Sequence, residues 1–364
     1  MNKQTRLILT GGFLGAGKTS LIWDVAQRLM SAGKRVGLIT NDQAPELVDS
    51  RLLEQAGLKV SEVSGSCFCC NFNGFTDAIR SVRQEAMADV ILAEPVGSCA
   101  DLSATIMQPL KKYWNTELLL SPLTVLADPS RLAPILGGGD GSLHEDAAYI
   151  FCKQLEESDI ILITKTDTLT DDELKDLVAR TEDKYPSSKV MTCSVQSGAG
   201  IDEWISEVSS RTDAGTKLLD IDYDRYAHGE AVLGWLNGTV MLHGSAVCWD
   251  QVLKDLMNGL LSRLLNEGLR IGHVKVIAEN GRQYAVGNIA GAGSLLTIRG
   301  SAGVSDDARL IINARVECSP EHLDQLVREQ LTAVVSSRLS EEVLAWRFLQ
   351  PGRPNPTHRF AEVM

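Results

Sequence analysis

Short apolar runs alternate with stretches of helical periodicity from Thr5 to about Arg211. Strands buried on both faces form continuous apolar runs, whereas helices between them repeat an apolar residue every three to four positions. The runs predict strands at residues 6–9, 36–40, 59–63, 90–93, 123–126, 160–163 and 189–192, with helices such as 20–30, 76–87 and 171–181 between them. This alternation predicts a mostly parallel sheet covered by helices, with ligands at the carboxyl ends of its strands.

The pattern changes around residues 212–216. Beyond them, the sequence predicts strands at 231–242, 272–278, 283–288 and 309–316, and helices at 249–266 and 320–334. Asn280-Gly281 is the dipeptide of a tight hairpin turn between two of these strands. We therefore expect an α/β domain over 1–212, a smaller α+β domain with an antiparallel sheet over 213–346, and an irregular tail rich in proline and arginine over 347–364.

Composition and charge narrow the class of protein. The 364 residues include 47 acidic and 35 basic side chains, so the formal net charge is −12 and a nucleic-acid backbone would be repelled. No apolar run approaches the roughly 20 residues of a membrane helix, and no signal peptide precedes the first strand. We expect a cytoplasmic protein with no nucleic-acid or membrane partner, whose eight cysteines are thiols or metal ligands rather than disulfides.

The strongest chemical signal follows the first expected strand. Residues 12–19 are Gly-Phe-Leu-Gly-Ala-Gly-Lys-Thr, a complete G-x-x-x-x-G-K-[ST] phosphate-binding loop, so the first domain is predicted to be a P-loop NTPase. The glycines let backbone N–H groups point at phosphate oxygens, and the following helix presents its positive end. Lys18 can reach the β- and γ-phosphates, and the Thr19 hydroxyl can bind Mg²⁺. The residues expected to hold the nucleotide here are Gly12, Gly15, Ala16, Gly17, Lys18, Thr19 and Ser20.

A carboxylate beyond the strand at 160–163 indicates which base is bound. Thr164-Lys165-Thr166-Asp167 follows the Asn-Lys-x-Asp pattern of G proteins, with Thr in place of Asn. Asp167 can accept hydrogen bonds from N1–H and the 2-amino group of guanine, a donor pair that adenine lacks. The stem of Lys165 can lie over the base, and Ser194 lies where a third base-contacting loop is expected. We expect GTP and GDP as ligands; the alternative is an ordinary helix cap.

Two acidic residues at strand ends are candidates for the Mg²⁺ site. Asp42 follows the strand at 36–40, and Glu94 begins Glu94-Pro95-Val96-Gly97 after the strand at 90–93. Glu94 can hold Mg²⁺ through water or orient the attacking water, so Lys18 and Glu94 are the catalytic candidates. Gly97 can follow the γ-phosphate as a switch residue. The alternative is that both acids are solvated loop carboxylates.

A cysteine cluster follows the strand at 59–63. Cys67, Cys69 and Cys70 offer three thiolates, which select soft or borderline ions such as Zn²⁺, Cu⁺ or Co²⁺. Adjacent cysteines cannot easily both wrap one ion, so we expect an open, exchanging site with a fourth ligand. Candidates for that ligand are Asp42, Glu46, Asp49, Cys99 or a second chain, and the last makes a homodimer one possible assembly. Free thiols and a redox sensor are the alternatives.

The order of these motifs resembles that of the CobW-type metallochaperone GTPases, which are similar to the urease and hydrogenase nickel-insertion GTPases. The resemblance covers roughly the first 210 residues and rests on the phosphate loop, Cys-x-Cys-Cys, Glu-x-x-Gly and Thr-Lys-x-Asp. It implies slow GTP hydrolysis and delivery of zinc or cobalt to a client protein. This chain departs from the family at residues 41–44, where Asn-Glu-Phe-Gly is usual, and has no histidine-rich stretch.

Three functions are therefore open. The first is a GTP-hydrolysing metal carrier, in which GTP cleavage changes the metal affinity of the cysteine cluster. The second is a GTPase chaperone of a cofactor enzyme, such as a corrinoid protein, with structural cysteines. The third is a P-loop kinase that moves phosphate to a small acceptor. The sequence favours the first.

Overall fold

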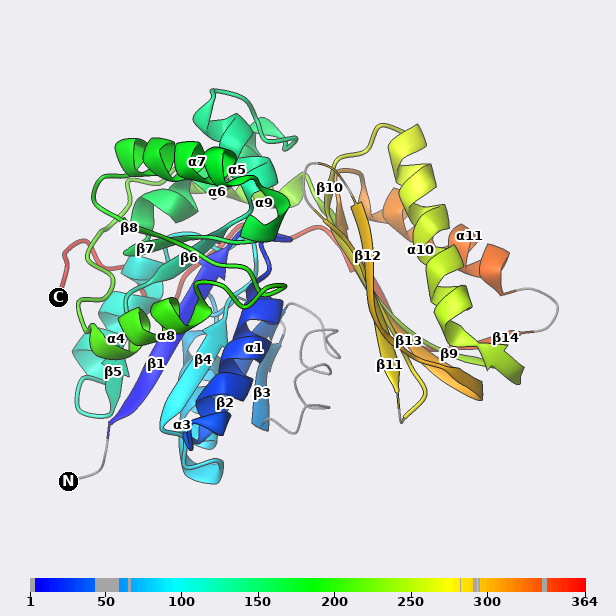
Figure 1. The fold of residues 1–364 in the computed structure, drawn as a ribbon, viewed down its shortest axis with the longest axis horizontal. Helices are drawn as coiled ribbons and strands as arrows, with labels where there is room; N and C mark the ends of the chain where they lie inside the picture. Colours follow the sequence, from blue (N-terminus) through cyan, green and yellow to red (C-terminus); the bar gives the residue numbers. More distant parts are fainter. Residues whose placement is uncertain are drawn as a thin grey trace.

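The computed structural model describes residues 4–42, 59–64, 67–281, 283–290, 293, 295–335 and 339–364. Its described part contains two β-sheets side by side (Figure 1). One is parallel and lies between two layers of helices, and the other is antiparallel with helices on one face. The predicted fold class is confirmed: a P-loop NTPase-like α/β unit followed by a smaller unit with an antiparallel sheet.

The first sheet has the strand order β3-β2-β4-β1-β6-β7-β8, with β5 beside β1, and these neighbouring strands pair in parallel. Its strands are β1 (Thr5–Gly12), β2 (Val36–Asp42), β3 (Lys59–Ser64), β4 (Val90–Glu94), β5 (Leu118–Leu120), β6 (Thr124–Ala127), β7 (Ile160–Ile163) and β8 (Lys189–Thr192). Because the strands are parallel and in close register, Gly12, Asp42 and Glu94 end at one edge of the sheet, where ligands gather in such folds.

Helices cover both faces of this sheet because alternate residues of each strand point to opposite sides. On one side Leu7 and Leu9 pack with the helices of the larger core cluster, and on the other Ile8 packs against α1 and α8. The helices are α1 (Lys18–Ser31), α3 (Phe72–Glu85), α4 (Gln108–Tyr113), α5 (Pro129–Leu136), α6 (Glu145–Glu157), α7 (Asp171–Lys184) and α8 (Ile201–Ser210). No helix in the described ranges is both long and apolar enough to cross a membrane.

The second sheet has the order β12-β11-β10-β13-β9-β14, and every pairing is antiparallel. Its strands are β9 (Gly234–Cys248), β10 (Ile271–Glu279), β11 (Tyr284–Ala290), β12 (Leu295–Ser301), β13 (Val304–Val316) and β14 (Ser340–Leu349). Helices α10 (Trp249–Asn266) and α11 (Pro320–Val334) cover the face turned away from the first sheet (Figure 1). The opposite face is turned toward the phosphate loop.

The structure corrects the expected end of this unit. Residues 347–349 were assigned to an irregular tail, but Arg347, Phe348 and Leu349 belong to β14 and pair with β9. β14 escapes detection because it is an exposed edge strand rich in charged residues, which hide the period-2 pattern. β5 and β12 were also not expected; β5 has only three residues.

Beyond β14, residues 350–364 contain no helix or strand and return to the first sheet's side of the molecule (Figure 1). Helix α9 (Tyr223–Ala231) also packs on that side, against α6. Ala214, Tyr226 and Leu233 belong to the core of the first sheet. The domain boundary at 212 remains a prediction.

Candidate nucleotide site and cysteine cluster

The phosphate loop joins the end of β1 to the start of α1. Its glycines have positive φ, at 131° for Gly12, 81° for Gly15 and 94° for Gly17, which residues with a Cβ adopt only with strain. Lys18, the first residue of α1, donates from Nζ to the carbonyls of Gly12 and Phe13 at 2.8 and 3.3 Å. Ala16 lies in the loop itself, and Ser20 lies in the first turn of α1. The side chain of Lys18 thus lies over the loop whose amides would cradle a phosphate.

Two of the predicted Mg²⁺ ligands meet directly. The Thr19 hydroxyl donates to Glu94 Oε1 at 3.1 Å, and both side chains are buried. Asp42 ends β2 at the same edge, but its side chain lies outside the described part of the structure. Gly97 is pressed against the loop, since a Cβ there would lie 2.7 Å from Leu14 Cδ2 and 3.1 Å from Lys18 Nζ. Lys18, Thr19, Glu94 and Gly97 therefore surround one point, where the terminal phosphate and its metal ion would lie.

The base-recognition loop follows β7 and is tied to its neighbours. Ser194 donates from its hydroxyl to Asp167 Oδ1, which orients the exposed carboxylate. Lys165 has a left-handed backbone, and its Nζ contacts Asp128 Oδ2 at 2.5 Å. Burial of Asp128 opposes its ionisation, but the charge and hydrogen bond of Lys165 together with the hydrogen bonds from Ser130 outweigh burial and lower the pKa of Asp128. The structure brings Lys165, Asp167 and Ser194 to the same end of the sheet, and their contacts with a base remain a prediction.

Thr164, which replaces the usual asparagine, links this loop to the phosphate loop. Its hydroxyl donates to the carbonyl of Ala16 at 2.8 Å. This bond fastens the base-recognition loop to the phosphate loop, and the hydroxyl of a threonine is sufficient for it.

The three clustered cysteines lie on the turn that precedes α3. The Sγ atoms of Cys67 and Cys69 are 3.0 Å apart, and those of Cys69 and Cys70 are 3.9 Å apart. Cys70 N and Asn71 N both donate to the carbonyl of Cys67, at 3.1 and 2.9 Å, which closes the turn. The N-terminus of α3 lies next to the cluster, and its positive end favours thiolates.

Cys99 joins this cluster as a fourth thiol. It lies in the loop after β4, close enough to Cys67 for the two thiols to shift each other's pKa. The thiols that donate to Cys67, Cys69 foremost, lower the pKa of Cys67, whereas the contact with Cys67 raises the pKa of Cys69 and that of Cys99. Of the expected fourth ligands, Cys99 is therefore adjacent, and Glu46 and Asp49 lie outside the described residues.

Two paths connect the nucleotide site to the cysteines. Asn41, at the end of β2, accepts from Phe68 N at 2.9 Å and donates to Val63 O at 2.7 Å. Phe68 stands between Cys67 and Cys69. In addition, residues 94–99 begin with Glu94 at Thr19 and end with Cys99 near Cys67. These two segments lie between the nucleotide site and the cysteines and offer a physical route between them.

The C-terminal tail covers the cysteine turn. Thr357 donates from N to the carbonyl of Cys69 at 2.8 Å and from its hydroxyl to the carbonyl of Cys70 at 3.1 Å, while Asn355 N lies 3.3 Å from Cys70 Sγ. Arg359 fastens the tail to the buried carboxylate of Asp101 at 2.7 Å.

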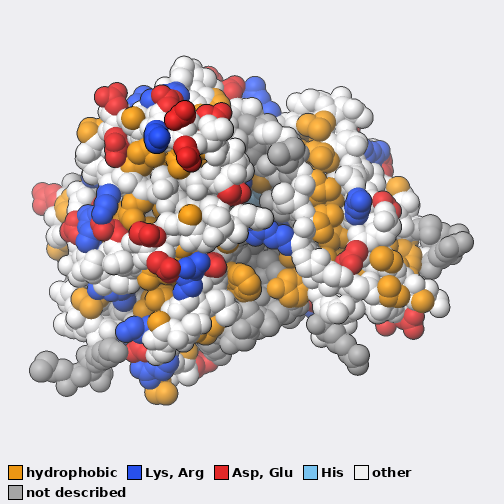
Figure 2. Space-filling view, in the orientation of Figure 1, with side chains coloured by type: hydrophobic (Ala, Val, Ile, Leu, Met, Phe, Trp, Pro, Cys, Tyr) orange, Lys and Arg blue, Asp and Glu red, His pale blue; other side chains and the backbone are white. Residues whose placement is uncertain are grey.

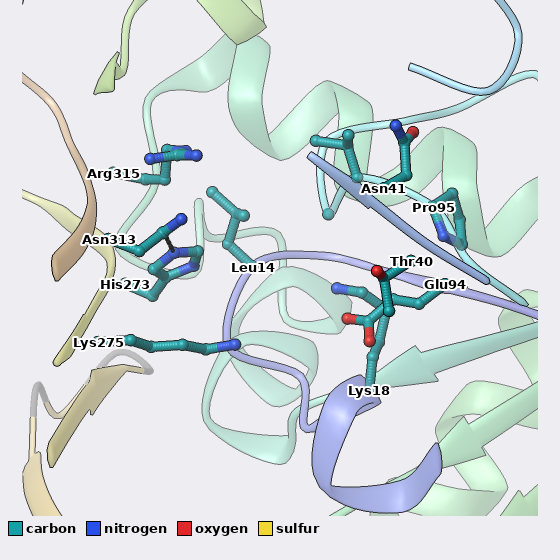
Figure 3. Close-up of a pocket in the computed structure, with 12 residues that line it drawn as sticks. Leu14, Lys18, Thr40, Asn41, Glu94, Pro95, His273, Lys275, Asn313 and Arg315 are labelled. Carbon is teal, nitrogen blue, oxygen red and sulfur yellow. Dashed lines mark hydrogen bonds between the residues drawn. The ribbon is translucent and has the colours of Figure 1, made fainter. Parts of the chain in front are cut away.

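A cavity of about 50 Å³ lies where the phosphate loop meets the second sheet (Figure 3). One wall consists of phosphate-loop and strand-end residues, among them Lys18, Glu94 and Gly97. The opposite wall consists of four polar residues of the second sheet, which are His273, Lys275, Asn313 and Arg315. Figure 3 shows the Lys275 side chain extending from β10 toward the phosphate loop.

Comparison with known proteins identifies the family to which the first unit belongs. Residues 6–192, more than half of the chain, match the family model described as CobW/HypB/UreG, nucleotide-binding domain. The chain belongs to this family.

Two curated relatives are similar to this chain at low sequence identity. The chain is 28% identical over 190 residues to the zinc chaperone CobW of Sinorhizobium sp, an alignment that covers 45% of this chain and 51% of the relative. It is 28% identical over 177 residues to the zinc-regulated GTPase metalloprotein activator 1 of Schizosaccharomyces pombe, covering 46% and 40%. The chain thus spans about half the length of the curated relatives it matches.

Solved structures resemble the fold only distantly. Zn(II)-bound YjiA GTPase from E. coli matches with a TM-score of 0.37 and 14% identity, over 92% of this chain and 99% of that one. HypB from Helicobacter pylori in complex with nickel matches with a TM-score of 0.42 and 13% identity, over 61% and 92%.

Several residues at this CobW-type site were not expected from the sequence. Asn41 and Asp128 act through partners far away in the chain, so no local pattern marks them. The cavity residues of the second sheet, in contrast, are visible in the sequence pattern. Asn313 and Arg315 interrupt the apolar run of β13 at alternate positions, and His273 and Lys275 interrupt that of β10 in the same way. Polar residues at every second position indicate a second, functional face of a strand.

Proposed function

We propose that this CobW-family chain is a GTP-binding metallochaperone that hydrolyses GTP slowly and transfers a zinc or cobalt ion from its cysteine cluster to a client metalloprotein. The ion is cargo, and the client receives it when the nucleotide state changes. Eight free thiols suit the reducing cytoplasm as the place of action.

The nucleotide part of the proposal is supported by three groups on one sheet edge. The phosphate loop with Lys18 would hold the phosphates, and Thr19 with Glu94 would hold Mg²⁺, aided by Asp42. Bound Mg²⁺ would neutralise charge on the β- and γ-phosphates. Asp167, oriented by Ser194, would accept from guanine N1–H and its 2-amino group.

The metal part is supported by the chemistry of the cluster. Cys67, Cys69 and Cys70 offer sulfurs that lie close enough to hold one ion, and Cys99 adds a fourth nearby. Sulfur ligands favour Zn²⁺ over the oxygen-seeking Mg²⁺, with Co²⁺ as a second fit. The lowered pKa of Cys67 supplies a thiolate at neutral pH.

The single observation that carries the proposal is the segment 94–99. Its first residue, Glu94, hydrogen-bonds Thr19 in the nucleotide site, and its last, Cys99, lies near the cysteine cluster, where it influences the pKa of Cys67. Gly97, between them, lies against Lys18, so it is the part of the segment that would lie next to the γ-phosphate. Loss of that phosphate would let the segment move and change the arrangement of sulfurs.

Zinc titration in two nucleotide states tests this function. The purified chain is loaded with GDP or with a non-hydrolysable GTP analogue and titrated with Zn²⁺, then with Co²⁺, in competition with a chromophoric chelator. We expect metal affinity to differ at least tenfold between the two states. Equal affinity in both states would overturn the coupled mechanism.

Three variants test the roles of the clustered cysteines and of Lys18. The C67S/C69S/C70S variant should lose the tight site, whereas the C152S/C248S/C318S variant, which removes the same number of isolated thiols, should keep it. Lys18→Ala should abolish nucleotide binding and remove the difference between states. Full zinc affinity in the C67S/C69S/C70S variant would show that the ion binds elsewhere.

A further inference from the structure

We propose that the second sheet reads the terminal phosphate: Lys275 of β10 contacts the γ-phosphate of the bound triphosphate, and Arg315 of β13 supplies a fixed positive charge beside it. The antiparallel unit would then distinguish GTP from GDP. This inference rests on the proposed function, because it concerns the same nucleotide.

The face that looks at the phosphate loop is polar in a specific region. β10, β13 and β9 pair so that His273, Arg315 and Trp235 form one row across the sheet, and Lys275, Asn313 and Asn237 form the next. Neighbouring residues of the same strands, such as Val274 and Ala314, point to the helices instead. Six polar or aromatic groups on three strands thus stand opposite the loop.

Hydrogen bonds within these rows hold the groups in place. Asn313 donates from Nδ2 to Asn237 Oδ1 at 2.6 Å and accepts from His273 Nε2 at 2.5 Å. Arg315 donates from Nη1 to the carbonyl of Leu236 at 3.1 Å, and its guanidinium stacks on Trp235 at 4.1 Å. Only 2% of Arg315 is exposed, so its charge cannot swing away.

Both walls of the cavity carry cations, and the phosphate-loop wall also carries the acid Glu94. Burial lowers the pKa of His273 well below its usual value, and the nearby charges of Lys275, Arg315 and Lys18 lower it further. His273 is therefore neutral, and Lys18, Lys275 and Arg315 are the basic residues that surround the cavity together with Glu94. Cations gathered in a partly buried site attract a polyanion, and each added phosphate charge strengthens the attraction.

The two walls are held close by direct contact. Arg131, which packs on Phe13 of the phosphate loop, donates to the carbonyls of Ile271 and Gly272 at 2.9 and 3.3 Å. A Cβ on Gly15 would lie 2.7 Å from Ala290 Cβ of β11. Figure 2 shows Lys and Arg side chains in the hollow between the two units.

The cavity has the size and place of a terminal phosphate. Its volume of about 50 Å³ admits a few water-sized groups, which suits one phosphoryl group and excludes a nucleoside. The cavity is bounded by Lys18, Glu94 and Gly97, the residues expected around the γ-phosphate and its metal. The base-recognition loop lies at β7, and none of its residues lines this cavity.

The test compares affinities for GTPγS and GDP, both as Mg²⁺ complexes, in Lys275→Gln, Lys275→Arg and Lys254→Gln variants of the full chain. We expect K275Q to weaken GTPγS binding about tenfold, the effect of one lost charge contact, and GDP binding less than twofold. K275R keeps the charge and should restore most GTPγS affinity. Lys254 is exposed on the far helix α10, so K254Q should bind both nucleotides like the wild type.

A selective loss is the decisive readout, because a merely structural role for Lys275 would weaken both nucleotides together. Unchanged GTPγS affinity in K275Q, or equal losses for GTPγS and GDP, would overturn the inference while leaving the proposed function intact. A wild-type chain that binds neither guanine nucleotide would refute the proposed function itself.

Discussion

At the scale of single residues, the site depends on side chains whose orientation is set by a neighbouring side chain. The carboxylate of Asp167 receives the Ser194 hydroxyl, and the Asp128 carboxylate faces the Lys165 ammonium. Each pair fixes a direction for its acceptor atoms. Such orientation matters more for selectivity than for stability, since a misdirected acceptor cannot pair with the base edge.

Asp167→Asn should change the nucleotide preference. An amide cannot accept from both donors of guanine, so GTP affinity should fall about 100-fold. The amide N–H can instead donate to the C2 carbonyl of xanthine, so binding of XTP should improve. Competition with a fluorescent nucleotide measures both. The matched variant Asp171→Asn, on the exposed start of α7, should bind GTP normally, and unchanged GTP affinity in D167N would argue against guanine recognition by this residue.

Glu230→Gln should change how stability depends on pH. Burial raises the pKa of Glu230 from 4.5 to about 8, so the folded chain keeps this proton over that interval and the unfolded chain loses it. Stability contributed by the neutral acid is therefore complete below about pH 4.5 and declines as pH rises toward 8. Glutamine keeps an oxygen acceptor for the Ser98 hydroxyl and does not titrate.

Thermal melting between pH 5 and pH 8 measures this effect. The wild-type Tm should fall more steeply with pH than that of E230Q, and the exposed-site control Glu145→Gln should follow the wild type. Parallel curves for the wild type and E230Q would mean that Glu230 titrates normally.

At the scale of elements, the C-terminal tail covers the cysteine turn. It has no regular structure of its own, yet Arg359, Thr357 and Asn355 each contact the first unit. The Arg359–Asp101 pair is the strongest of these anchors, because Asp101 is fully buried and its carboxylate would otherwise lack a cation.

Arg359→Ala should loosen the tail and expose Cys70. We expect alkylation of Cys70 by a maleimide to become at least threefold faster, as followed by mass spectrometry of the peptide. Arg353→Ala is the control within the same tail, because its ion pair with Asp224 is exposed and weak. Equal Cys70 rates in wild type and R359A would mean that the tail is not held by this bond.

Elements also differ in how far sequence predicts them. Strands such as β7, buried on both faces, appear as plain apolar runs, and α10 and α11 show full helical periodicity. β5 is too short and β14 too charged and exposed for either signal. In the candidate site, contiguous motifs such as the phosphate loop were detectable, whereas Asn41, Asp128 and Lys275 acquire their places only when distant strands come together.

At the scale of the whole molecule, the contact between the two sheets decides which nucleotide state the second unit can sense. That contact includes Ala290 against Gly15, the Arg131 bonds to β10 and Trp235 of β9 packed into the core of the first unit. Inter-unit contacts of this kind permit relative motion unless they are large and apolar. The nucleotide would then act as an additional link between the sheets.

Ala290→Trp should separate the two units. The indole has no room beside Gly15, so β11 must move away from the phosphate loop. We expect a larger radius of gyration in small-angle X-ray scattering and GTPγS affinity reduced toward that of the K275Q variant. Val304→Trp adds the same bulk at an exposed position near the start of β13 and should change neither. An unaltered radius in A290W would mean that the interface adapts locally.

The alternation along β13 makes this unit intolerant of insertions. Successive residues face the helices and the nucleotide in turn, with Ile312 and Ala314 on the first side and Asn313 and Arg315 on the second. Adding one amino acid to the strand would reverse which residues face each side. The Arg315 guanidinium would then point into the hydrophobic core, and apolar side chains would face the triphosphate. Length variation among relatives should therefore be confined to the hairpins and spare this strand.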